Sequence, residues 1–218
     1  MKTYDIYLFD LDGTLTDSVV IWLDIVRQAL AEVGITGLDN KTIAKHTHDF
    51  DEMTKLGVSP SDLNRFKDAA HRVAVELLPT AVLHDGAANM LSKLRNAGKR
   101  TGLYTAVRQP GLNAVLEHHG LFTFFDAIVA RSDVARGKPY PDGLHKAMEL
   151  LGEPRENYSR AVYIGDKDTD LMTAQNAGID AVLYFPPSHA ALYDRSDLEA
   201  LKPTAIITGW GELLKTLI

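Results

Sequence analysis

The chain has 218 residues, of which 45% are apolar and 24% are charged, and its formal net charge is −6. These values are ordinary for a globular protein, and the length allows one large domain or a core with a smaller insertion. The acidic balance, without a cluster of Lys or Arg, argues against nucleic acid as the main partner. The lack of cysteine excludes disulfides, thiolate catalysis and cysteine-ligated zinc.

No transmembrane run is visible in the sequence, and Met1–Asp5 lacks the features of a signal peptide. We therefore expect a cytoplasmic protein without a membrane partner. The sequence is compatible with a monomer or a homodimer.

The first feature is an apolar run, Tyr4–Phe9, that predicts a buried strand and ends in Asp10, Leu11, Asp12 and Gly13. Residues two apart in a strand point to the same side, so Asp10 and Asp12 are expected to project together. Two adjacent carboxylates raise one another's pKa, and a hard divalent cation between them relieves this. A surface Asp-x-Asp-Gly turn is the alternative interpretation, but the strand before it and the capped helix after it favour the cation site.

Residues 16–80 predict helices and no strand. Asp17 and Ser18 are N-cap candidates for a helix that stops at Gly34, and a second helix opens near Ser59. We expect this segment to be an all-α insertion.

The polar stretch between the two helices contains residues that could face a ligand, although a surface loop is the simpler interpretation. These are His46, His48, Asp49 and Asp51. Trp22, in the first helix, is expected to lie in the core of the insertion rather than to form a substrate platform.

From about residue 81, strands and helices alternate. Strands are predicted at Arg100–Tyr104, Asp126–Ala130, Arg160–Ile164, Asp180–Phe185 and Ala205–Thr208. Helices are predicted at Gly86–Ala97, Gln109–His119, Pro141–Leu151, Asp168–Ala177 and from about Gly209. The alternation predicts an α/β fold, a Rossmann-like parallel sheet covered by helices on both faces, built from residues 1–15 and 81–218. Ligands of such sheets bind at the carboxyl ends of the strands.

Polar residues follow several of these strand ends. Thr105 can donate a hydrogen bond to a phosphoryl oxygen, or it can cap a helix. Lys138, held between Gly137 and Pro139, can neutralise a nucleophile and a phosphate, or it can lie on an exposed loop. After the strand at Ile164, residues 165–170 form a Gly-Asp-x-x-x-Asp loop that suits either a cation site or a helix cap.

Taken together, these segments resemble the four motifs of the haloacid dehalogenase-like superfamily, in its Asp-x-Asp branch of phosphatases and phosphomutases. The motifs correspond to residues 9–18, Thr105, residues 136–142 and residues 165–170. The insertion after the first motif resembles the C1-type cap of the family. The similarity extends over essentially the whole chain, and it is strongest to small-molecule phosphatases of the phosphoglycolate-phosphatase kind.

The resemblance implies that Asp10 attacks phosphorus to form an aspartyl-phosphate, and that Asp12 acts as general acid and then as general base. It implies Mg²⁺ as cofactor, held by Asp10, the backbone carbonyl of Asp12 and Asp166. Asp170 would be a second metal ligand or would orient Lys138.

The resemblance also assigns phosphate or substrate binding to Thr105, Ala106, Arg108 and Lys138. Ala106 stands where many phosphatases of the family carry Asn, and Arg108 is a candidate to replace that contact. Lys167 stands where a small residue is common, so it is a candidate to meet the cap or the substrate. Asp168 is left as a possible helix cap.

We therefore expect Mg²⁺-dependent hydrolysis of a small phosphorylated metabolite, a phosphate monoester. One alternative is a phosphomutase of the β-phosphoglucomutase type, which the core motifs do not separate from a phosphatase. A silent phosphate-binding domain is a second alternative, which the complete set of Asp10, Asp12, Lys138 and Asp166 disfavours. A dehalogenase is disfavoured because that branch lacks the second Asp of the pair.

Overall fold

The computed structural model describes residues 2–46 and 50–215. Its strands are β1 (Ile6–Phe9), β2 (Arg100–Tyr104), β3 (Ala127–Val129), β4 (Ala161–Gly165), β5 (Asp180–Tyr184) and β6 (Ala205–Ile207). Its α-helices are α1 (Val19–Glu32), α2 (Asn40–Ala44), α3 (Leu63–Leu77), α4 (Ala87–Asn96), α5 (Gly111–His118), α6 (Asp142–Leu150), α7 (Asp168–Ala177), α8 (Arg195–Glu199) and α9 (Trp210–Leu214). Its 3-10 helices are η1 (Phe50–Leu56), η2 (Leu78–Thr80), η3 (Phe122–Phe124), η4 (Arg131–Asp133), η5 (Arg155–Arg160) and η6 (Pro187–Ala191).

The strands form a parallel sheet in the order β3-β2-β1-β4-β5-β6, with β1 at its centre. The register sets Phe9 beside both Leu103 and Ile164. The segments that follow β1, β2 and β4 therefore leave the sheet side by side at one edge. This confirms the predicted parallel α/β core and the common edge at which its strand-end residues meet.

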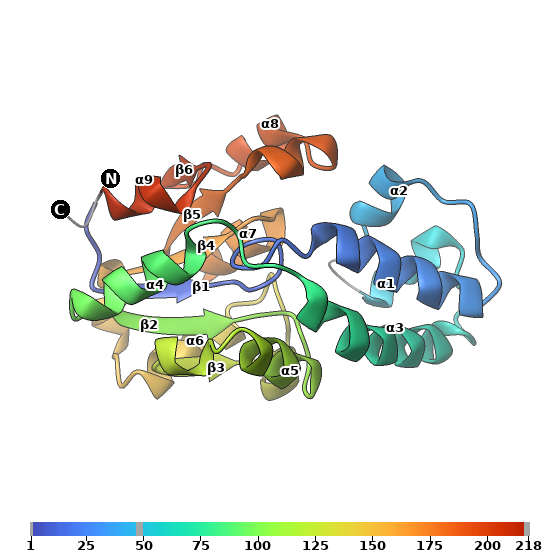
Figure 1. Ribbon diagram of the computed structural model, residues 1–218, viewed down its shortest axis with the longest axis horizontal. Helices are drawn as coiled ribbons and strands as arrows, with labels where there is room; N and C mark the ends of the chain where they lie inside the picture. The colour runs from blue at the N-terminus through green and yellow to red at the C-terminus, as the bar shows by residue number, and fades with distance from the viewer. Residues whose placement is uncertain (1, 47–49, 216–218) are drawn as a thin grey trace.

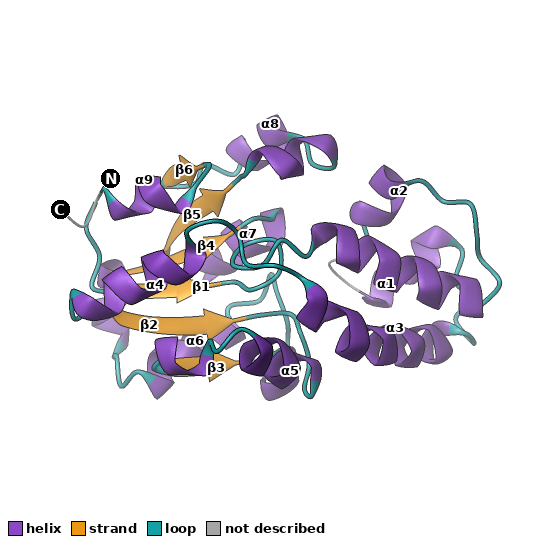
Figure 2. Cartoon of the chain, viewed as in Figure 1, coloured by secondary structure: helices purple, strands orange, loops and turns teal. Residues whose placement is uncertain are grey.

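Helices cover both faces of the sheet (Figure 2). Along β1, Tyr7 and Phe9 pack into the cluster that includes α4, α5 and α9, whereas Ile6 and Leu8 pack into the cluster that includes α6 and α7. Every residue of β1 is buried. Apolar residues at every position, rather than at alternate ones, are what a strand covered on both faces requires.

The helices of residues 16–80 lie beyond the carboxyl ends of the strands, at the right of Figure 1. Helices α1 and α3 pack together around buried residues such as Phe66, and their outer faces are joined by the ion pair of Arg72 with Glu32 at 2.8 Å. Gly34, with φ of 83°, ends α1 as predicted. Among the described residues, no helix combines the length and the apolar character that crossing a membrane requires.

Most predicted elements agree with the structure to within one or two residues at their ends, which is the uncertainty of any boundary definition. No element is predicted from the sequence between Phe185 and Ala205, whereas the chain forms η6 and α8 there. Both are only five residues long. Such short helices carry too few turns to show a helical periodicity of apolar residues.

Candidate active site

A cavity of about 420 Å³ lies where the helices of residues 16–80 face the carboxyl edge of the sheet. The sheet side contributes the strand-end residues singled out from the sequence: Asp10, Asp12, Thr105, Ala106, Arg108, Lys138 and Asp170. The helical side contributes aromatic and basic residues: Trp22, Phe50, Lys67 and His71. The predicted site residues therefore meet in one cavity, except Asp166, which is fully buried just behind it.

Lys138 joins two of the carboxylates. Its Nζ donates to Asp10 Oδ1 at 2.6 Å and to Asp170 Oδ1 at 2.6 Å. The side chain of Lys138 is only 7% exposed, so these are buried ion pairs. The ammonium therefore lies inside the site rather than on an exposed loop.

Asp170 accepts four hydrogen bonds. Its Oδ2 accepts the backbone N–H groups of Asp166 and Lys167, each at 3.1 Å, and its Oδ1 accepts from Lys138 and from the hydroxyl of Tyr163 at 3.3 Å. A carboxylate offers about four lone-pair positions, so these donors fill the capacity of Asp170. The bonding favours the orienting role of Asp170 over the role of a metal ligand.

Asp166 is held against the first loop of the chain. Thr14 Oγ1 donates to its Oδ1 at 3.1 Å, and a Cβ on Gly13 would lie 2.4 Å from its Oδ2. Gly13 also has a φ of 79°, so the turn and this close approach both require glycine. Oδ2 of Asp166 is buried and has no hydrogen-bond partner among the described residues.

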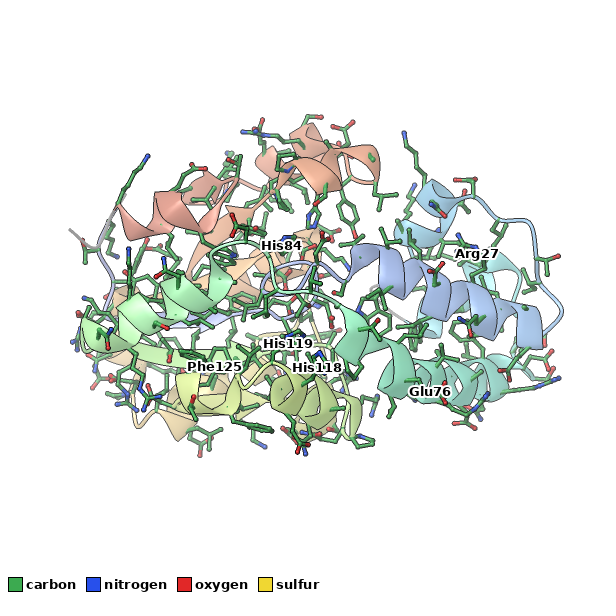
Figure 3. The ribbon with its side chains drawn as sticks, in the orientation of Figure 1. Arg27, Glu76, His84, His118, His119 and Phe125 are labelled. Carbon is green, nitrogen blue, oxygen red and sulfur yellow. The ribbon has the colours of Figure 1, made fainter. Side chains whose placement is uncertain are left out.

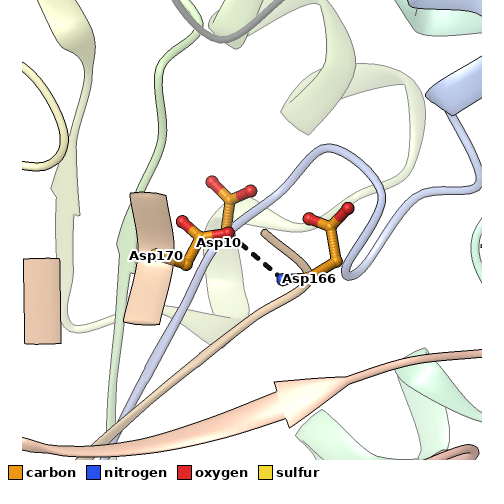
Figure 4. Close-up of side chains that lie close together, drawn as sticks. All are labelled: Asp10, Asp166 and Asp170. Atoms are coloured by element: carbon orange, nitrogen blue, oxygen red, sulfur yellow. Dashed lines mark hydrogen bonds between the residues drawn. The ribbon is translucent and has the colours of Figure 1, made fainter. Parts of the chain in front are cut away.

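Oxygen atoms of Asp10, Asp166 and Asp170 lie within 4.8 Å of one another (Figure 4). Three buried carboxylates at this separation repel one another, and Lys138 compensates only two of them. The unpartnered oxygen of Asp166 and the all-oxygen donor set fit a hard divalent cation.

The carboxylate of Asp12 is not part of the three-carboxylate group. Ser18 Oγ donates to Asp12 Oδ1 at 2.8 Å and accepts the N–H of Gly13 at 3.1 Å. Ser18 does begin α1, but its side chain makes no capping bond. The hydroxyl predicted to cap the helix instead fixes Asp12.

Trp22 is also a hydrogen-bonding neighbour of the Asp12 carboxyl. Its ring packs on Phe50, with centroids 6.1 Å apart, and it lines the cavity. Trp22 therefore packs against the core, as predicted, and it also borders the cavity. An amphipathic helix face cannot, by sequence alone, be told from a face that borders a cavity.

Burial raises the pKa of Asp12 and Asp166 above the ordinary range of a carboxyl, and it raises that of Asp10 to about 7. At Asp10 the positive charge of Lys138 offsets part of this increase. Burial would lower the pKa of Lys138, but the charges of Asp10 and Asp170 outweigh it and hold that pKa above its usual value. At both Asp10 and Lys138, burial and the neighbouring opposite charges therefore shift the pKa in opposite directions.

Thr105 is fully buried, and its Oγ1 accepts the N–H of Val107 at 3.1 Å. The hydroxyl shapes the turn before α5, and its proton remains available to a ligand. Ala106 and Arg108 lie on the same turn, exposed at the cavity wall. Their contact with phosphate stays a prediction.

Lys167 lines the cavity as well. A hydrogen bond joins its side chain to the hydroxyl of Tyr193, and its Nζ lies 6.0 Å from the centre of that ring. Lys167 is the N-cap residue of α7, Asp168 is the first residue of that helix, and Asp170 accepts the N–H of Lys167. Asp168 also accepts the N–H of Thr169 at 2.7 Å, so both Asp168 and Asp170 bind backbone N–H groups at the start of α7.

Of the candidates in the polar stretch of the insertion, His46 has a described side chain. His46 Nδ1 lies 3.8 Å from a Glu52 oxygen, and His46 is not among the described residues that line the cavity. The other candidates lie outside the described residues; these are His48, Asp49 and the side chain of Asp51.

Comparison with known proteins indicates the same family as the sequence motifs, over most of the chain. The family model described as haloacid dehalogenase-like hydrolase matches residues 7–184. A phosphoglycolate phosphatase of Rhodobacter capsulatus is 27% identical over 223 residues, covering 93% of this chain and 96% of that protein. The pyrophosphatase PpaX of Bacillus cereus is 32% identical over 217 residues, covering 96% and 94%. The crystal structure of CbbY from Rhodobacter sphaeroides in complex with phosphate shares the fold, with a TM-score of 0.80, 22% identity and 99% of each chain covered.

Lys138 is expected to be essential for the stability of the metal-free protein. We predict that Lys138→Met lowers the free energy of unfolding in EDTA by about 3–5 kcal/mol, because it leaves buried carboxylates uncompensated. The loss should be larger at pH 8 than at pH 5. Asp10 already has a pKa raised to about 7, so it binds a proton below that pH and loses it above.

Urea unfolding measures this difference, and Lys99→Met is the matched control. Lys99 pairs with Asp5 at 3.1 Å, but the carboxylate is 51% exposed, so this loss should stay below about 1 kcal/mol. Equal losses in the two variants, or a Lys138→Met loss that does not change with pH, would contradict the interpretation.

Proposed function

Because this chain belongs to the haloacid dehalogenase-like hydrolases, we propose that it hydrolyses a small phosphate monoester through an aspartyl-phosphate, with Mg²⁺ as cofactor. The observation that carries the proposal is the arrangement around Lys138. Its ammonium binds Asp10 and Asp170 at 2.6 Å each, and the second carboxyl, Asp12, lines the same cavity. In this proposal, the first carboxylate is the nucleophile and the second transfers the proton.

Asp10 is the proposed nucleophile. Its carboxylate oxygen attacks phosphorus, a new O–P bond forms, and the bond from phosphorus to the leaving oxygen breaks. At about 4 Å, two like unit charges repel by about 4 kcal/mol at an effective dielectric constant near 20, which is roughly a thousandfold in rate. Lys138 reduces this repulsion between the carboxylate and the phosphoryl group.

Asp12 is the proposed acid and base. Burial raises its pKa, which favours the protonated form that the first step needs. Asp12 gives its proton to the leaving oxygen. It then takes a proton from the water that attacks phosphorus, and the bond between phosphorus and Asp10 breaks. The hydroxyl of Ser18, bonded to Asp12 Oδ1, keeps the carboxyl facing the cavity.

Asp10, the backbone carbonyl of Asp12 and Asp166 would hold the Mg²⁺. When bound, the ion neutralises carboxylate and phosphoryl charge so that the two anions can approach. Asp170, whose acceptor positions are filled by protein donors, is assigned to orienting Lys138. Thr105 is assigned to the phosphoryl oxygens, with the backbone of Ala106 beside it.

The helices of residues 16–80 act, in this proposal, as a cap over the core of residues 1–15 and 81–218, and they select the leaving group. Basic side chains from both sides of the cavity lie near one another: Lys67 and His71 of α3, and Arg108 of the core. Burial lowers the pKa of His71, and the nearby positive charges of Arg108 and Lys67 lower it further. These residues favour a leaving group that carries an acidic group of its own. Phosphoglycolate and pyrophosphate, after which two relatives are named, both carry one.

The test of the activity is phosphate release across sugar phosphates, nucleotides, phosphoglycolate, pyrophosphate and 4-nitrophenyl phosphate. We expect turnover with Mg²⁺, none with EDTA, and a loss of at least a thousandfold in Asp10→Asn. Release that needs no metal, or that survives in Asp10→Asn, would contradict the mechanism. No release except in the presence of a sugar bisphosphate would indicate the phosphomutase, and metal and phosphate binding without any turnover would indicate the silent domain.

The test of the leaving group compares two arginines. Arg108→Ala should raise KM about tenfold or more for a substrate with a second acidic group, because a charge-assisted hydrogen bond contributes about 1.5–3 kcal/mol. KM for 4-nitrophenyl phosphate should change less than about twofold. Arg136→Ala is the control, since Arg136 also lines the cavity but is held by Asp142 at 2.8 Å. Equal changes for both substrates in Arg108→Ala would refute the assignment to the leaving group and would indicate a contact with the transferred phosphoryl group instead.

A further inference from the structure

A buried histidine lies behind the proposed metal site, on a part of the chain that the mechanism does not use. His189 belongs to η6, in the segment that follows β5, and it is 1% exposed. Its ring is enclosed by aromatic residues, with centroids 6.1 Å from Phe185, 5.6 Å from Tyr193 and 6.0 Å from His84. His84, labelled in Figure 3, lies on the segment that connects η2 to α4.

His189 faces the carboxylate of Asp166. Its Nδ1 lies 3.7 Å from Asp166 Oδ2, and the two side chains are 1% and 0% exposed. Among the described residues, neither ring nitrogen of His189 nor Oδ2 of Asp166 has a hydrogen-bond partner. Buried polar groups without partners are rare and destabilising, and here an unpartnered donor and an unpartnered acceptor face each other. A shift of about 0.7 Å would bring them to an ordinary N–H···O distance.

The geometry makes His189 a suitable donor to this carboxylate, because Nδ1 is the ring atom that faces Asp166 Oδ2. A neutral imidazole carries one N–H, which can reside on Nδ1. A neutral donor adds a hydrogen bond to Asp166 without adding a positive charge that would compete with a cation.

We propose that His189 is a positioning residue for Asp166, donating its Nδ1–H to Oδ2 while Thr14 donates to Oδ1. The two donors hold the carboxylate from both sides and leave acceptor positions for the divalent cation. The inference rests on the proposed function, because it requires a cation at Asp166. It assigns a role to His189 in the 186–193 segment, whose Tyr193 already bonds the cavity-lining Lys167. A residue that holds a metal ligand in place through a hydrogen bond typically contributes 10–100-fold in metal affinity.

The test is Mg²⁺ binding to the metal-stripped full chain, measured by isothermal titration calorimetry. His189→Phe keeps the aromatic contacts but removes the donor, and it should weaken Mg²⁺ binding tenfold or more. His189→Asn places an amide N–H near the position of Nδ1 and should stay within about threefold of wild type. His145→Phe is the control. His145 lies on α6, where its ring packs on Tyr158 with centroids 5.8 Å apart, and its substitution is expected to leave the Mg²⁺ affinity unchanged.

Mg²⁺ binding by His189→Phe that equals wild type would overturn the inference, as would an equal loss in the Asn variant. Should His189→Phe fail to fold, the tautomer of His189 in the wild type decides, by long-range ¹H–¹⁵N NMR. A proton on Nδ1 that shifts on Mg²⁺ addition supports the role, and a proton on Nε2 contradicts it. Wild type that binds no Mg²⁺ would overturn both this inference and the metal of the proposed function, whereas unchanged binding in His189→Phe with normal turnover would overturn this inference alone.

Discussion

The burial of several carboxylates at one edge of the sheet is the constraint on which the rest of the site depends. The register of β1 with β4 pairs Phe9 with Ile164, so Asp10 and Asp166 follow that pair by one and two residues and emerge at the same edge of the sheet. Water would normally solvate such charges, but here only 5% of Asp10 and none of Asp166 is exposed. The chain compensates with the ammonium of Lys138 on one side and with hydroxyl and amide donors on the others. A site assembled in this way has a place for a further cation and for an anionic ligand.

Much of this could be predicted from the sequence because the motifs coincide with strand ends. A buried strand followed by Asp-x-Asp-Gly, and another followed by Gly-Asp-x-x-x-Asp, must meet if the strands are parallel neighbours. The positions of Asp10, Asp12, Lys138 and Asp166 follow from that rule and from the family resemblance. By the same rule, the segment that follows β5 starts at this edge of the sheet, and His189 of that segment could have been considered as a site residue.

The features that the sequence did not predict depend on which of two possible partners a side chain contacts in the folded chain. Ser18 has the signature of an N-cap, and only the fold shows that its hydroxyl binds Asp12 instead. Trp22 has the spacing of a core residue, and only the placement of α1 over the sheet edge shows that it borders the cavity. Asp170 could be a ligand or a partner of Lys138, and its four donors became visible only with Tyr163 and two backbone amides in place. These are tertiary outcomes, which local patterns do not encode.

The bond between phosphorus and Asp10 is the defining feature of the proposed reaction, and the most direct measurement is to trap the aspartyl-phosphate. With 4-nitrophenyl phosphate, whose leaving group departs without a proton, Asp12→Asn should form the aspartyl-phosphate but hydrolyse it slowly, because no base activates the water. Acid quenching followed by mass spectrometry of the peptides should then show a phosphoryl adduct on Asp10, absent from Asp10→Asn. Release of 4-nitrophenol by Asp12→Asn without any adduct on Asp10 would contradict the account.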